Sequence, residues 1–150
     1  MPLSDDSQIS STPASTALLV AVLMLTMALG AFPIVGTAVV ATALADDLGM
    51  SLTLFGAGVA VNTLFGAVFA PISGRFSDRQ GGKWSCVLVL ISSGFGLVIV
   101  ALAGSPLVLI LGLLVSSYGQ GACNPATNKL VAERAAPGRR GTMTGIKQSG

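Results

Sequence analysis

Three long stretches of the chain carry no charged side chain, and they decide the class of protein. No Asp, Glu, Lys or Arg lies between Ser7 and Ala45, between Leu48 and Gly74, or between Trp84 and Asn128. A helix needs about 20 apolar residues to cross the roughly 30 Å hydrocarbon core of a bilayer. The third stretch is about twice that length, so it must hold two crossings. The pattern therefore predicts an all-α integral membrane protein.

Turn residues divide these stretches into separate spans. Gly104, Ser105 and Pro106 interrupt the longest stretch, because serine can cap a helix and proline is favoured at the first helical position. The prediction is four complete transmembrane helices and the start of a fifth, over about 15–45, 51–73, 85–103, 107–131 and 140–150. Residues 1–14 are predicted to form a polar tail. The first apolar stretch is too long for a signal peptide and no Lys or Arg precedes it, so we expect it to be retained.

The basic residues predict how the spans are oriented. All 8 Lys and Arg lie either between the second and third spans or around the connection from the fourth to the fifth. The other connections carry Asp46 and Asp47, or no charge. Because Lys and Arg are retained on the cytoplasmic side, both basic segments are predicted to be cytoplasmic. Parity then places the amino terminus and the polar tail in the cytoplasm, with the protein spanning the cell membrane several times.

Composition excludes several other classes of protein. The chain is 52% hydrophobic and 9% charged, whereas soluble domains carry about 25% charged residues. A net charge of +2 arises from a few local clusters and gives no support for nucleic-acid binding. There is no His, and Cys86 and Cys123 lie in apolar stretches, so no metal, disulfide or cofactor is expected. No phosphate-binding loop or nucleophile motif is present, and we expect no enzyme activity.

The fourth span is the most polar. Ser117, Gln120, Asn124 and Asn128 fall within about 80° of one another on a helix. Such a stripe is unstable against lipid, so it is predicted to face the bundle or a water-filled cavity. Pro125 lies within the stripe and is expected to bend or locally open the helix, because it lacks a backbone donor.

Three further polar residues are candidates for the lining of a solute path or for structural roles. Asn62, inside the second span, either forms an interhelical hydrogen bond or contacts a solute. Lys129, near the surface, is expected to extend its ammonium group towards the headgroups. Lys147 lies roughly 10 Å inside the fifth segment and either attracts an anion, pairs with an acid or anchors the interface. The span over 85–103 has no side chain more polar than that of serine, and we therefore expect this helix at the lipid-facing periphery of the bundle.

The stretch from 74 to 84, GRFSDRQGGKW, is the most specific motif. It is predicted to form a tight turn between the second and third spans, in which glycines permit close packing and reversal of the chain. Asp78 and Arg79 place opposite charges in that turn. Lys83 and Trp84 are expected to anchor the next helix at the interface.

This motif resembles the loop between the second and third helices of the major facilitator superfamily, which reads Gly-x-x-x-Asp-Arg-x-Gly-Arg-Arg/Lys. The matching residues are Gly74, Asp78, Arg79, Gly81 and Lys83. Gly82 replaces a basic residue of the family, which puts one ionic contact in question. The stretch over 124–150 is also similar to bacterial members, and the resemblance covers about 15–150.

The resemblance implies a fold and a function. Family members have twelve helices in two halves, built from inverted three-helix repeats around a site that opens alternately to either side. It implies that this chain is the amino-terminal part of a secondary transporter for a small solute, inactive without its carboxy-terminal half. Asp78 would meet a helix end of that half and, with Arg79, favour the outward-facing state. The candidates to line the solute path are Asn62, Gln120, Asn124, Asn128 and Lys147.

Two alternatives remain open. A small four-helix exporter that works as a dimer would need a carboxylate buried in the membrane, and Asp46 and Asp47 lie only at a span end. A membrane fragment or assembly subunit without transport activity would show no solute-dependent change in stability. In that case the substitution Asp78→Asn would have no effect.

Overall fold

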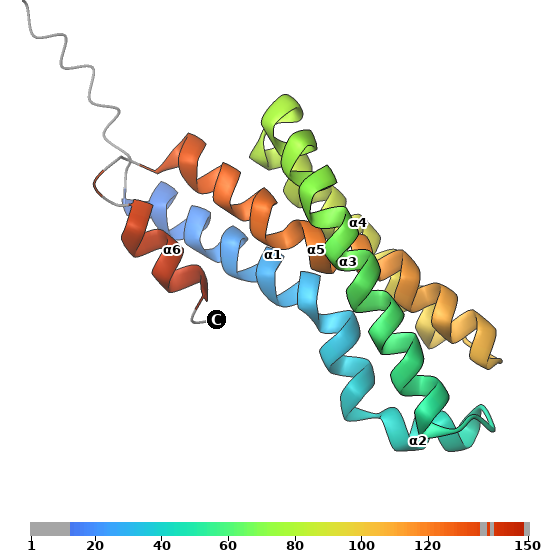
Figure 1. Ribbon diagram of the computed structural model, residues 1–150. Coiled ribbons are helices and arrows are strands. Elements are labelled where there is room, and N and C mark those ends of the chain that lie inside the picture. The colour runs from blue at the N-terminus through green and yellow to red at the C-terminus, as the bar shows by residue number, and fades with distance from the viewer. Residues whose placement is uncertain (1–12, 136–137, 139, 149–150) are drawn as a thin grey trace, which may run out of the picture.

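The computed structural model describes residues 13–135, 138 and 140–148, which form a bundle of helices without a strand in those ranges (Figure 1). Residues 1–12, most of the predicted polar tail, lie outside the described residues. The helices are α1 (Pro13–Val39), α2 (Ala41–Asp47), α3 (Leu52–Gln80), α4 (Gly82–Ala101), α5 (Pro106–Arg134) and α6 (Arg140–Gln148). By length and composition, α1, α3, α4 and α5 can each cross a membrane. The fold is therefore the all-α membrane bundle that the charge-free stretches predict.

The first predicted span, over 15–45, is divided into two helices. Val40 lies between α1 and α2 with φ −102° and ψ 16°. The part that can cross a membrane is Thr16–Val39, of 24 residues, and α2 follows it as a separate short helix. Inside α1, the Thr37 hydroxyl donates a hydrogen bond of 2.6 Å to the Pro33 carbonyl oxygen. This bond satisfies a buried hydroxyl within its own helix.

The motif from 74 to 84 is helical except at one residue, so the tight turn predicted between the two spans is shorter than the motif. Helix α3 continues to Gln80, α4 starts at Gly82, and only Gly81 lies between them. Gly81 has φ 87°, a left-handed conformation that glycine adopts without steric cost. The apolar stretch marks the part of a helix inside lipid, whereas the helix itself extends into the headgroup layer. Asp78 and Arg79 therefore lie on the last turn of α3.

Helix α5 is the centre of the bundle and packs against α1, α3 and α4 (Figure 1). In its most apolar part 44% of the residues are buried, against 33% in α4 and 22% in α1 and α3. The composition of α4 predicted a peripheral, lipid-facing helix, and this prediction is correct for only one of its faces. Its outer face, with Ile91, Phe95 and Val98, is exposed, but its inner face packs on α5.

Glycines permit the close helix crossings. A Cβ atom on Gly121 of α5 would overlap the backbone carbonyl oxygen of Gly66 on α3. Between α4 and α5, a Cβ on Gly96 would lie 2.6 Å from Ser116 Cβ and 2.8 Å from the Gly112 carbonyl oxygen. Small residues let helix backbones approach closely in lipid, where the hydrophobic effect does not drive association. Backbone contact therefore holds α3 and α4 to α5.

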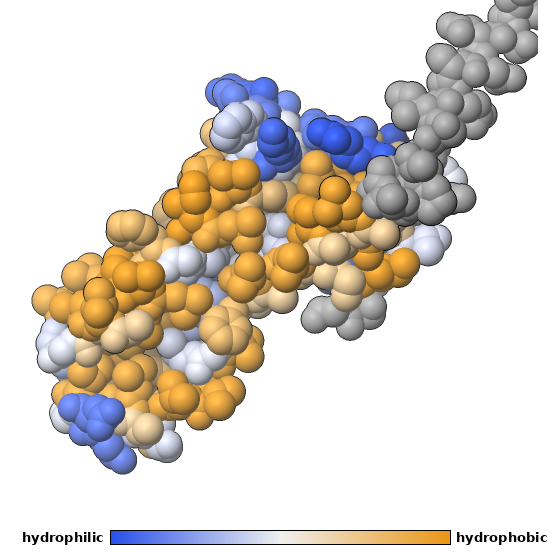
Figure 2. Space-filling model, turned by 180° about the vertical axis from the view of Figure 1, so that it is seen from behind, coloured by the Kyte–Doolittle hydropathy of each residue, from blue (hydrophilic) through white to orange (hydrophobic). Residues whose placement is uncertain are grey.

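The bundle has two polar ends and an apolar surface between them, as Figure 2 shows for one face. We call one of these the basic end; its described cations are Arg75, Arg79, Lys83, Lys129, Arg134 and Arg140. The opposite end carries Asp46 and Asp47. Large apolar side chains such as Leu18 and Phe95 are about two-thirds exposed on the sides of the bundle. This distribution fits a protein whose sides face lipid.

Candidate functional site

The side chain of Lys147 is buried between α6 and α5. Only 1% of Lys147 is exposed. Its ammonium group donates hydrogen bonds to the Thr127 hydroxyl at 2.8 Å and to the Asn128 side-chain oxygen at 2.6 Å. The Thr127 hydroxyl in turn donates to the Cys123 carbonyl oxygen at 2.6 Å. The ion pairs found among the described residues do not include Lys147. A positive charge is therefore held in the bundle by neutral oxygens alone.

Two predicted path residues lie beside this lysine. Asn128 binds it directly, and Asn124 accepts a hydrogen bond of 3.5 Å from the Gln148 side chain, one residue further along α6. Both asparagines are exposed, although they lie on a helix that can cross a membrane. The structure thus brings Asn124, Asn128 and Lys147 together on one polar face, which we call the α5–α6 face.

The rest of the predicted stripe on α5 points towards α3. Gln120 is half-buried and its side-chain oxygen would lie 3.3 Å from a Cβ on Gly66. That oxygen is buried and has no hydrogen-bond partner among the described residues. Ser117 is fully buried and donates a hydrogen bond to the Leu114 carbonyl oxygen. The predicted stripe therefore contacts α3 at Ser117 and is exposed at Asn128. Pro125 lies inside α5, which remains helical on both sides of it.

Asn62 belongs to the α3–α5 contact and lies apart from the α5–α6 face. It is 1% exposed, and its amide nitrogen donates hydrogen bonds to the Leu113 carbonyl oxygen and, at 3.2 Å, to the Ser116 hydroxyl. These bonds cross from α3 to α5. The geometry favours the interhelical alternative for Asn62 over contact with a solute.

The motif at the end of α3 forms an ion pair with α5. The Lys129 ammonium donates to the Asp78 carboxylate at 3.2 Å, with side chains 30% and 74% exposed. Lys129 thus has a partner, and does not simply extend to the headgroups. An exposed pair of this kind contributes at most about 1 kcal/mol. Most of the Asp78 side chain remains accessible to a further partner.

The other members of the motif have looser surroundings. Arg79 and Lys83 are exposed, and the Lys83 ammonium lies 5.8 Å from the centre of the Trp84 ring. No described atom lies within 4 Å of a Cβ placed on Gly74. The close packing predicted for Gly74 is therefore not found among the described residues.

A contact that the sequence analysis missed joins the start of α4 to the end of α5. The backbone N–H of Gly82 donates to both carboxylate oxygens of Glu133, at 3.2 and 3.1 Å. This N–H is one of those that a helix leaves without an internal partner at its first turn, where a negative charge is also favourable. Gly82 itself packs against the backbone of Leu130, and a Cβ there would overlap the Leu130 nitrogen. One feature of the sequence could have indicated this contact: Glu133 is the only acidic residue after Asp78, in a part of the chain that otherwise carries only basic charges.

We expect the substitution Glu133→Ala to lower the free energy of unfolding by about 1 kcal/mol, as for the loss of a helix cap. Glu133→Gln is the matched control, because it keeps an acceptor oxygen, and it should cost less. Unfolding in mixed micelles, followed by circular dichroism, measures both values. Equal stability of Glu133→Ala and the unchanged chain would show that the Gly82 contact contributes nothing.

The comparison with protein families agrees with this architecture. Residues 18–150 match the sequence model of the Major Facilitator Superfamily. The chain belongs to the major facilitator superfamily. No curated protein matches the chain. The resemblance inferred from the motif at the end of α3 is thus confirmed over nearly the whole chain, and the protein is a multi-pass membrane protein of a transporter family.

Within this superfamily member, the functional candidates form two separate groups. The motif around Asp78 lies at the basic end and is linked to α5 through Lys129. The α5–α6 face combines the exposed Asn124 and Asn128 of α5 with the buried Lys147 of α6. Thr127, which contacts Lys147, was missed because it lies beside the predicted stripe and 20 positions before the lysine.

Proposed function

We propose that the chain is the amino-terminal part of a secondary active transporter that moves a small solute by alternating access. The observation that carries this proposal is the exposed α5–α6 face beside a buried lysine. Exposed amides on a membrane-crossing helix are costly against hydrocarbon, and such residues line water-filled cavities or face other helices. We infer that this face lines the solute path and that a second half of the transporter closes its other side.

The ion pair at the basic end supports a gate in this proposal. Alternating access requires two packings of similar free energy that bind the solute differently. Among the described residues, Asp78 is tied to α5 only by an exposed pair with Lys129, so it can exchange that partner for a helix of the second half at low cost. The positive-inside rule places the basic end on the cytoplasmic side of the cell membrane. Asp78 and Arg79 would then stabilise the state that is closed to the cytoplasm.

Uptake by proteoliposomes tests this function. We expect the 150-residue chain alone to give no uptake of any solute above protein-free liposomes, because the path lacks one wall. A transporter that contains this chain together with its second half should take up solute. There, Asp78→Asn should change the rate while the protein still inserts and folds. Uptake by the chain alone, or unchanged uptake in the Asp78→Asn transporter, would contradict the proposal.

A further inference from the structure

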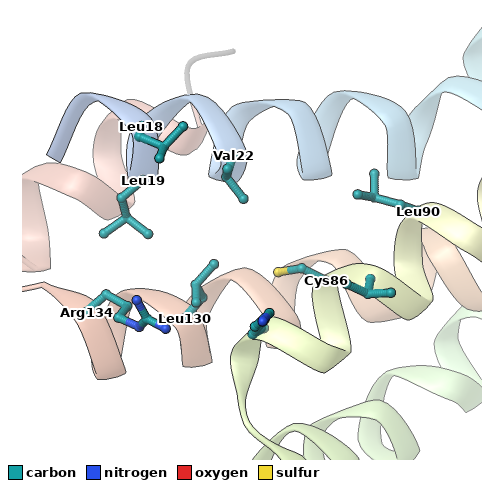
Figure 3. A pocket seen from close by; sticks show the side chains of 9 residues that line it. Leu18, Leu19, Val22, Cys86, Leu90, Leu130 and Arg134 are labelled. Atoms are coloured by element: carbon teal, nitrogen blue, oxygen red, sulfur yellow. The ribbon is translucent and has the colours of Figure 1, made fainter. Parts of the chain in front are cut away.

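A groove lies between α1, α4 and α5 close to the basic end, and its described lining does not include the residues of the α5–α6 face. Its volume is about 500 Å³. Leu18 and Val22 of α1 form one wall, and Leu90 of α4 and Leu130 of α5 lie across from them (Figure 3). Leu18 is 67% exposed and Val22 and Leu90 are each 36% exposed, so the groove opens to the side of the bundle. In a membrane, that side faces the lipid chains.

Two cations line the same groove at its polar end. Lys83 stands at the start of α4 and Arg134 at the end of α5, and both belong to the lining. Figure 3 shows Arg134 next to Leu130 on α5, across the groove from the leucines of α1. Both cations are exposed, and neither is found in an ion pair with another described residue. The part of the chain that the structure describes places no acidic side chain in the lining of the groove, and the neighbouring Glu133 carboxylate accepts a hydrogen bond from the Gly82 N–H. The groove thus combines apolar walls with two positive charges that have no ion-pair partner among the described residues.

We propose that this groove binds a phospholipid with an anionic headgroup. One acyl chain would lie along Leu18, Val22 and Leu90, and the headgroup would contact Lys83 and Arg134. Basic pockets between membrane helices bind anionic headgroups, and arginine suits phosphate geometry particularly well. An apolar helix in the groove would leave both cations without an anion. A zwitterionic headgroup would place its own ammonium group beside two positive charges.

Binding at this place would strengthen α1, one of the two least buried spans of the bundle. Only 22% of the most apolar part of α1 is buried, and Leu18 and Val22 lie on its exposed side. A lipid held by α4 and α5 and in contact with α1 would connect α1 to the central helix. The anionic lipid is therefore a structural ligand at the basic end, independent of the solute path.

Native mass spectrometry of the purified chain tests the proposal with phosphatidylglycerol and phosphatidylcholine of identical acyl chains. Each cation near an anionic surface contributes about 1 kcal/mol, so two of them predict a preference of about 30-fold for phosphatidylglycerol. The double variant Lys83→Gln, Arg134→Gln should lose most of this preference, to a few-fold or less. The charge-preserving double variant Lys83→Arg, Arg134→Lys should retain it.

The matched control is Arg75→Gln, which removes an exposed cation on α3 outside the groove and should leave the preference unchanged. A test on the unaltered chain uses phosphatidylglycerol with a photoreactive group on its acyl chain, which should label peptides of α1 and α4. Equal binding of the two lipids, an equal loss in Arg75→Gln, or labelling spread evenly over all helices would overturn the proposal. Occupation of the groove by another helix would also appear as an absence of lipid preference.

Discussion

Replacing Gly121 with alanine is expected to separate α3 from α5 and to cause a large loss of stability. The added Cβ would overlap the backbone carbonyl oxygen of Gly66, and neither backbone can move without disturbing its helix. Overpacking of this kind costs about 3 kcal/mol. The free energy of unfolding in mixed micelles, followed by circular dichroism, measures the loss.

The matched control for Gly121→Ala is Gly94→Ala on α4. No described atom lies within 4 Å of a Cβ on Gly94, and this residue is exposed. The same chemical change should therefore leave the stability unchanged or raise it slightly, because alanine favours the helix. If Gly121→Ala were as well tolerated as Gly94→Ala, the close crossing of α3 and α5 would not hold the bundle together.

The second large effect is expected for Lys147→Met, with opposite signs for stability and function. The ammonium group is buried, and its hydrogen-bond partners in the described ranges are the neutral side chains of Thr127 and Asn128, so no described anion compensates the burial of its charge. An apolar side chain of similar length removes that cost, and the free energy of unfolding should rise by about 1 kcal/mol or more. In a transporter that contains this chain, binding of an anionic solute should weaken by about 30-fold or more, since a buried charge partner is lost.

Lys147→Arg is the control that separates charge from shape. It keeps the positive charge and should retain part of the solute affinity, while it gives none of the gain in stability. Thermal unfolding of the chain and uptake by the whole transporter measure the two effects. A Lys147→Met variant that is less stable and equally active would assign the lysine a purely structural role.

The sequence was sufficient for the features that depend on local rules. The break before Pro106 was predicted from Ser105, whose hydroxyl accepts a hydrogen bond of 3.4 Å from the Val108 N–H. Ser51 caps α3 in the same way, accepting from the Leu54 N–H at 3.2 Å. Capping and the length of apolar stretches act within a few neighbouring residues, so a single sequence contains them.

The contacts between helices could not be predicted from the sequence. The bond from Gly82 to Glu133 joins residues 51 positions apart, and Lys147 meets Thr127 across a helix connection. Periodicity shows which residues share a face of one helix, but it does not show which helix that face meets. For the same reason Asn62 was a candidate for the solute path until its bonds to α5 were known.

Water accessibility of the α5–α6 face tests the central claim most directly. Asn124→Cys is introduced into a transporter that contains this chain together with its second half and in which the other cysteines, Cys86 and Cys123 included, have been replaced by serine. Vesicles that contain this transporter are treated with a membrane-impermeant thiol reagent. Ile91→Cys is the control at a comparable distance along its helix from the basic end, because Ile91 is 57% exposed on the outer face of α4. We predict rapid modification of Asn124→Cys and none of Ile91→Cys. Equally slow modification of both would show that the α5–α6 face meets lipid, and that the solute path does not run along α5.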